Sequence, residues 1–166
     1  MRKTTKLLIA FGVLFLGIQA IRPEKNLSND QTYDISKKYT IPDEVNDILK
    51  VACNDCHSNY TRYPWYAEIQ PAASWLASHV NDGKRHLNYS EFLKRPIAVQ
   101  NHKFEETIEM VKEKEMPLAS YTYLGLHADA RLTDEQRVLL TTWAQAQMDM
   151  LKATYPADSL VMPKRR

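Results

Sequence analysis

The chain has little of several features on which other fold and function classes depend. Among its 166 residues only four are glycine and two are cysteine, and the formal charge at pH 7 is +2. Few glycines and few alternating β-branched runs favour helices over strands. A nearly neutral chain lacks the basic surface that nucleic-acid binding requires. We therefore expect an all-α protein with no nucleic-acid partner.

Both cysteines lie in one short motif, Cys53-Asn54-Asp55-Cys56-His57. A C-x-x-C-H sequence is typical of a c-type haem attachment site. Each sulfur can form a thioether to one vinyl group of the same porphyrin, and the adjacent imidazole then lies where its nitrogen can bind iron. We expect one haem c, attached covalently through Cys53 and Cys56, with His57 as an iron ligand.

Three other interpretations of the cysteine pair compete with haem attachment. A thioredoxin-like redox pair belongs near a βαβ pattern, and the sequence has none. A zinc site would need histidines to complete the tetrahedron, because there is no second cysteine pair. A disulfide between Cys53 and Cys56 would close a small, strained loop.

Residues 1–21 have the pattern of an export signal. Arg2, Lys3 and Lys6 precede an apolar run from Leu7 to Ile21, and a basic start followed by an apolar segment directs export. The run is short for a membrane span, which needs about 20 residues, and it lacks a clear small-residue cleavage site. We expect an uncleaved inner-membrane anchor or, alternatively, a cleaved signal peptide, with the rest of the chain periplasmic.

The rest of the chain divides into a polar tether over 22–40, a haem-binding domain over 41–153 and a loose tail over 154–166. The tether has no sustained hydrophobic period. The domain starts with a helix at Pro42, which has two acidic residues in its first turn and leads to Cys53.

Further helices are expected over Ala67–Val80, after the N-cap residue Ser90, and from Asn101 onward. The last helix begins at Thr133, where Gln136 three residues later completes a capping box.

Several short motifs follow the cysteine pair in close order: Tyr63-Pro64-Trp65-Tyr66, Ser74-Trp75-Leu76, His79-Val80 and Leu87-Asn88-Tyr89-Ser90-Glu91-Phe92. Together with C-x-x-C-H, this succession resembles the bacterial haem-binding domain family, a group of envelope proteins related to monohaem, class I cytochromes c. The likeness extends over roughly Pro42 to Gln147. The resemblance implies a single covalent haem in a small cytochrome c-like helical domain. It also implies that Trp143 of the last helix packs against the helix that begins at Pro42.

A methionine followed by proline, Met116-Pro117, lies well after the haem motif and ahead of the last helix. Class I cytochromes c present their axial thioether at this place, so the resemblance implies that Met116 is the sixth iron ligand. Proline stiffens the loop, and methionine opposite histidine raises the reduction potential. The other methionines have no comparable context. Four histidines are rival ligands: His79, His86, His102 and His127. Iron without a sixth protein ligand is a further alternative.

The expected function is electron transfer by a monohaem cytochrome, with a redox protein as partner and no catalytic residue. Two alternatives are a peroxidase-like enzyme that reduces a small molecule and a haem-based sensor or binding module. Against the enzyme, there is one haem motif and no distal acid/base pair recognisable by spacing. Against the sensor, the chain has no separate output domain.

Overall fold

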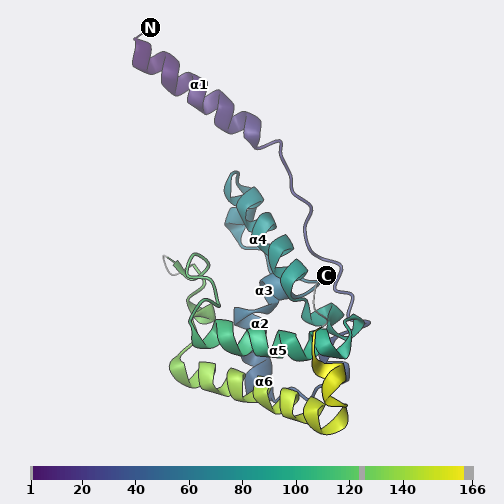
Figure 1. The fold of residues 1–166 in the computed structure, drawn as a ribbon. Helices are drawn as coiled ribbons and strands as arrows, with labels where there is room; N and C mark the ends of the chain where they lie inside the picture. Colours follow the sequence, from purple (N-terminus) through teal and green to yellow (C-terminus); the bar gives the residue numbers. More distant parts are fainter. Residues whose placement is uncertain (1, 124–125, 163–166) are drawn as a thin grey trace.

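Helices make up all the regular structure in residues 2–123 and 126–162, the part of the chain that this computed structural model describes (Figure 1). In chain order the elements are α1 (Lys3–Ile18), η1 (Ile35–Lys37), α2 (Asp43–Ala52), α3 (Asn54–His57), η2 (Trp65–Glu68), α4 (Ala72–His86), η3 (Tyr89–Lys94), α5 (Ile97–Lys112), η5 (Ala128–Ala130), α6 (Asp134–Thr154) and η6 (Ala157–Leu160). The predicted all-α class is confirmed.

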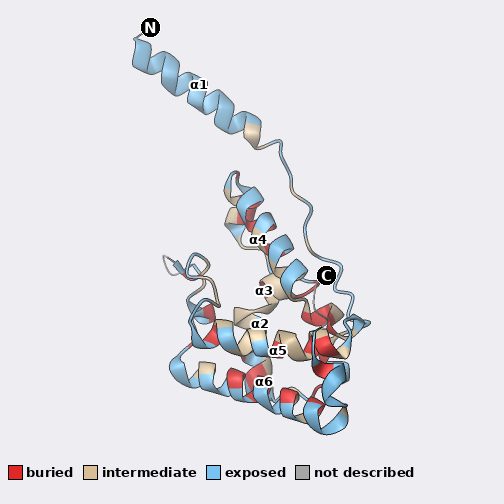
Figure 2. Ribbon diagram, in the orientation of Figure 1, coloured by how far each residue is buried: buried red, intermediate tan, exposed pale blue. Residues whose placement is uncertain are grey.

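The main core lies where α2, α5 and α6 pack together with η1 and η3, and Figure 2 shows buried residues concentrated there. Phe104 of α5 is 1% exposed, and its ring centroid lies 5.0 Å from that of Tyr39, 5.1 Å from that of Phe92 and 5.7 Å from that of Trp143. Trp143 of α6 shares this core with the apolar face of α2. The last helix therefore packs against α2, as the resemblance implied.

A second, smaller cluster lies between η2 and α4. Its buried members are Ala67, Leu76 and Val80, and the partly buried Tyr66 and Cys56 pack against them. Through Cys56, this cluster joins α4 to α3, the short helix that carries most of the cysteine motif.

α1 extends away from the domain and has no buried residue (Figure 1). Among the described residues, no helix combines the length and the apolar character that crossing a membrane requires. The chain just after α1 is nonetheless attached to the domain. The Gln70 backbone N–H donates to the side-chain oxygen of Gln19 at 3.0 Å, and the Gln70 side-chain amide donates to the Ile21 carbonyl at 2.8 Å.

Residues 22–40, predicted as a polar tether, lie along the domain and contact it. Ile35 and Tyr39 are buried in the main core, and the Tyr39 hydroxyl donates to Gln100 at 2.6 Å. The side-chain amide of Asn26 donates to the Ser58 carbonyl at 2.9 Å. Isolated apolar residues in a polar segment leave no periodic pattern, so the sequence did not reveal this packing.

The helix predicted over Ala67–Val80 is divided. Residues Trp65–Glu68 form η2, and α4 begins only after Pro71 but then continues to His86. The N-cap of the short helix η3 is Asn88 rather than Ser90, because the Asn88 side chain accepts the Ser90 N–H at 3.1 Å.

Two other boundaries also differ from the prediction. α5 begins directly after Pro96, ahead of Asn101, since proline suits the position before a first helical turn. The tail predicted to be loose contains η6, whose Leu160 is buried in the main core. Residues 163–166 of that tail lie outside the described residues.

Candidate functional site

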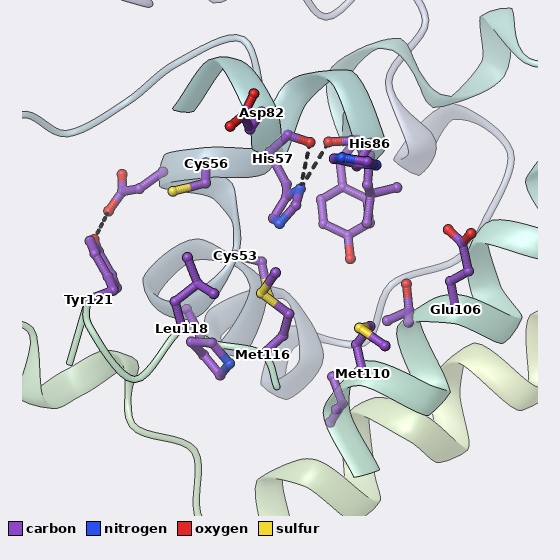
Figure 3. Close-up of a pocket in the computed structure, with 18 of the residues that line it drawn as sticks. Cys53, Cys56, His57, Asp82, His86, Glu106, Met110, Met116, Leu118 and Tyr121 are labelled. Atoms are coloured by element: carbon purple, nitrogen blue, oxygen red, sulfur yellow. Dashed lines mark hydrogen bonds between the residues drawn. The ribbon is translucent and has the colours of Figure 1, made fainter. Parts of the chain in front are cut away.

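A cavity of about 590 Å³ lies beside the cysteine motif (Figure 3). This volume is within the range of about 300–1,000 Å³ that is usual for small-molecule and cofactor sites. Its walls come from α2, α3, α4, α5, α6 and the loop after α5. Among its lining residues are Cys53, Cys56, His57, Met110 and Met116. The cavity thus brings together all the residues that the sequence predicted to hold haem and its iron.

The imidazole of His57 projects into the cavity in a fixed orientation (Figure 3). Its Nδ1 atom lies 3.0 Å from the carbonyl oxygen of Gly83 and 3.0 Å from that of Leu87. Both partners are acceptors, so Nδ1 carries the proton and Nε2 keeps its lone pair. Burial lowers the pKa of His57, which favours the neutral ring. Histidines that bind a metal usually donate their other ring N–H to such a carbonyl.

Gly83 allows α4 to come close enough to hold His57. A Cβ atom on this residue would lie 2.5 Å from the carbonyl oxygen of Cys56 and 3.0 Å from the Cys56 Cβ. No side chain fits at that position, so glycine permits the contact between α4 and α3. The helix predicted from the sequence ended at Val80, so the sequence analysis did not identify Gly83; the possible signal was a lone glycine just beyond that helix.

The two cysteines are free thiols, not a disulfide. Burial, and then the neighbouring Cys56, raise the pKa of Cys53 to about 12. Burial, and then the Asp55 carboxylate, raise the pKa of Cys56 to about 11. A redox-active cysteine pair needs a thiolate, which a raised pKa disfavours. Within the described residues, no three His, Cys, Asp or Glu side chains gather closely enough to hold a metal ion, so that part of the chain offers no donor set for the zinc alternative.

Met116 lies in the loop after α5, and its sulfur faces the cavity below His57 in Figure 3. The Met116 N–H donates to the Met110 carbonyl at 3.1 Å. The guanidinium of Arg137 donates to the carbonyls of Met116 at 2.9 Å and Val111 at 2.8 Å. The structure thus brings Met116 to the wall of the same cavity as His57, and its role as an iron ligand stays a prediction.

Met110, which the sequence did not single out, also lines the cavity. It shares one face of α5 with Lys103 and Glu106, which line the cavity too. These residues are three or four positions apart, a spacing that places them on one face of a helix and was a possible signal of a second functional face. The apolar residues of the opposite face form the more conspicuous pattern in the sequence.

The four rival histidines are divided by the structure. His79 and His86 line the cavity from α4, the helix whose Gly83 carbonyl accepts from His57. His102 and His127 are not among the residues that line the cavity. The two ring nitrogens of His102 lie 3.2 Å and 3.1 Å from carboxylate oxygens of Glu105 and Glu106 on α5, and His127 shares a hydrogen bond with a tyrosine of η2.

Asp55, the second residue between the two cysteines, is part of the site, but the sequence analysis did not identify it as a functional residue. It is 6% exposed. Its carboxylate accepts hydrogen bonds from the backbone N–H of Arg62 at 2.9 Å, from the Arg62 guanidinium at 2.9 Å and from the Tyr121 hydroxyl at 2.8 Å. Tyr121 lines the cavity, so this carboxylate joins the cysteine motif to the loop that carries Met116.

The fold and the cavity define a class of protein: a small helical domain whose mostly apolar pocket offers two thiols, an oriented neutral imidazole and a thioether. These groups fit haem, because neutral imidazole and thioether are ligands of haem iron and thiols can attach the porphyrin. The haem-binding domain family matches residues 13–146, more than half of the chain, and the chain belongs to this family. It is therefore a haem-binding protein.

The matched range begins well before Pro42, so it includes part of α1 and the segment that lies along the domain. No curated protein and no solved structure matches this chain.

Proposed function

We propose that the chain holds one haem c, attached covalently through Cys53 and Cys56, with His57 and Met116 as the axial ligands of the iron, and that it transfers electrons. The observation that carries this proposal is the orientation of His57, whose Nδ1 is held by two carbonyls while Nε2 is left free inside a cavity that both thiols and Met116 also line. A ligand held in this way needs little rearrangement to bind.

Haem iron, when bound, supplies one-electron redox chemistry. The residues of this chain provide the conditions for it. The carbonyls of Gly83 and Leu87 keep the His57 ring from turning. Arg137 joins the end of α5 to the Met116 backbone, because it donates to the carbonyls of Val111 and Met116. The mostly apolar walls lower the polarity around the bound group, which favours a high potential together with a methionine ligand. Two protein ligands on rigid supports suit electron transfer better than substrate binding.

We also propose that the domain lies on the periplasmic side of the inner membrane, held there by an uncleaved N-terminal segment. The basic residues before the apolar run support export, and side chains such as Leu7 and Phe11 of α1 are 69% and 71% exposed, which favours an apolar surrounding such as lipid. Cell fractionation with intact-mass measurement tests both parts. A mature chain that begins after Ile21 would replace the anchor with a cleaved signal, and a cytoplasmic protein would refute export.

The axial ligand is tested by the visible spectrum of the ferric protein. Wild type should have the weak far-red band of a methionine–iron bond, and Met116→Ala should lose it and bind carbon monoxide in the ferrous state. Met110→Ala is the matched control, because Met110 lines the same cavity and should be dispensable. If only Met110→Ala loses the band, Met110 rather than Met116 is the ligand. Immediate binding of carbon monoxide by the wild-type protein would favour the alternative function of an enzyme or a sensor.

Covalent attachment is tested by mass. Protein made with a haem-maturation system should weigh more than the bare chain by one haem, and the haem should stay with the chain after denaturation. A colourless protein, or haem that separates on denaturation, would refute the attachment through Cys53 and Cys56.

A further inference from the structure

The loop that carries Met116 is attached to the rest of the domain at two places. Arg137 donates to the Met116 carbonyl at 2.9 Å. Further along the loop, the Tyr121 hydroxyl donates to Asp55 at 2.8 Å, and Figure 3 marks this bond by a dashed line from Tyr121. The second attachment is made to the cysteine motif itself, because Asp55 lies between Cys53 and Cys56.

The ring of Tyr121 has a second, separate contact. It stacks on His127 with a centroid distance of 4.0 Å and an interplanar angle of 11°. His127 in turn shares a hydrogen bond of 2.7 Å with the hydroxyl of Tyr66 in η2. The stacking depends on the aromatic ring, whereas the contact with Asp55 depends on the hydroxyl. A substitution that removes only the hydroxyl therefore isolates the contact between the loop and the motif.

The hydrogen bond between Tyr121 and Asp55 is a strong one. The acceptor is a buried carboxylate, and hydrogen bonds to a charged group are stronger than those between neutral groups. Burial, together with the nearby Asp55 charge, raises the pKa of Tyr121 above its usual value, so the phenol keeps its proton and donates. Without this donor, Asp55 would still accept three hydrogen bonds from Arg62, one from its backbone N–H and two from its guanidinium. The motif would remain in place, and the loop would lose its link.

We infer that Tyr121 is a positioning residue for the sixth iron ligand: by binding Asp55 it ties the Met116 loop to the haem-attachment segment and keeps small external ligands from the iron. This inference rests on the proposed ligation by His57 and Met116. On this inference, the hydrogen bond between Tyr121 and Asp55 sets the fraction of molecules in which Met116 is away from the iron and a small external ligand can bind.

The test is Tyr121→Phe in the full haem-loaded chain. The far-red methionine–iron band should weaken or disappear, and the ferrous protein should take up carbon monoxide about 10- to 100-fold faster than wild type, the range expected for a lost hydrogen bond to a charged group. The amount of covalent haem should not change. Tyr123→Phe is the matched control, because this tyrosine follows in the same loop and is 67% exposed; it should behave as wild type.

A second control separates positioning from general loss of stability. Ile48→Val shortens a side chain of the main core that does not line the cavity, and should lower the unfolding midpoint without changing the band or the uptake of carbon monoxide. If it weakens the band as much as Tyr121→Phe does, the positioning role is refuted. The role is also refuted if Tyr121→Phe keeps the wild-type band and uptake while Met116→Ala loses the band. If Met116→Ala keeps the band as well, the proposed ligand is wrong, and the positioning role fails with it.

Discussion

The two halves of the domain are stabilised differently. The main core, between α2, α5 and α6, fills its interior with its own side chains, among them Phe104 and Trp143. The half built from α3, η2 and α4 has a smaller set of buried apolar residues, most of them alanines, and its inner face borders the cavity; the set is Ala67, Ala73, Leu76, Ala77 and Val80. The comparison suggests that the first half folds by its own packing and that the second depends on a cofactor.

α5 belongs to both halves. Its Phe104 is buried in the main core, Glu106 and Met110 line the cavity, and Val111, near the end of the helix, is buried in the core and also lines the cavity. Away from Val111, a change on one face of α5 should reach the other face only through movement of the whole helix. The two halves can therefore be perturbed separately, and the expected effects differ in kind as well as in size.

The largest effect is expected from replacing both cysteines, Cys53→Ala with Cys56→Ala. Covalent haem should be lost completely, because no other thiol is present in the chain. After extraction of any haem that still binds loosely, α3 and α4 should lose protection from hydrogen exchange, since the cavity they border would be filled by water. α5 and α6 should keep most of their protection. The measurement is hydrogen exchange followed by mass spectrometry, with wild type as reference.

Equal loss of protection in all four helices would contradict the comparison, because it would make haem necessary for the main core too. Full protection of α4 in the haem-free variant would also contradict the comparison, because it would show that this half folds without a cofactor.

Phe104→Ala should cause the largest loss of stability among single substitutions. Phe104 is 1% exposed and contacts three other aromatic rings. Removing a buried phenylalanine costs about 3–5 kcal/mol, which is comparable to the whole stability of many small domains. Denaturant unfolding of the haem-loaded protein measures this effect. Val138→Ala, at a site that is 64% exposed, is the control and should change little. A loss below about 1 kcal/mol would show that the main core is not the principal source of stability.

Gly83→Ala should act on the other half. Its methyl group would lie 2.5 Å from the Cys56 carbonyl, so α4 must move away from α3 and withdraw one acceptor from His57. Overpacking of this kind costs about 1–3 kcal/mol, and the better helix propensity of alanine offsets part of it. We expect a lower unfolding midpoint and less incorporated haem. Gly17→Ala is the control, because nothing lies within 4 Å of its Cβ position. A fully loaded, equally stable Gly83→Ala protein would mean that this contact is not needed.

The same division explains what the sequence could predict. In α2 and α6 the apolar residues recur at helical spacing along one face, and both helices have recognisable first turns. Their helical structure and their position were therefore predictable from the local sequence pattern. The C-x-x-C-H motif identified the place of the site because its chemistry is local too. Confirmation of haem binding followed from the family match.

The rest of the site depends on contacts between residues that are far apart in the sequence. Asp55 meets Tyr121 across 66 positions, and His57 meets the Gly83 carbonyl across 26. Neither contact has a local period, and a backbone carbonyl has no sequence signature. The packing of Tyr39 into the core was missed for the same reason. The Asp55 carboxylate and the Tyr39 hydroxyl are accommodated inside the protein because each has a hydrogen-bond partner, and both partners are distant in the sequence.

The smallest effect that still separates the two halves is expected from Thr133→Ala. Thr133 accepts the Gln136 N–H at 3.2 Å, and the Gln136 side chain accepts the Thr133 N–H at 2.9 Å, which completes the predicted capping box at the start of α6. Loss of the cap should cost about 1 kcal/mol. Because α6 packs mainly in the core rather than against the cysteine motif, the visible spectrum should not change. Thr142→Ala, on the exposed face of the same helix, should be neutral or slightly stabilising. A spectral change in Thr133→Ala with an unchanged unfolding midpoint would mean that the start of α6 supports the cavity instead, through Arg137 and the Met116 loop that it holds.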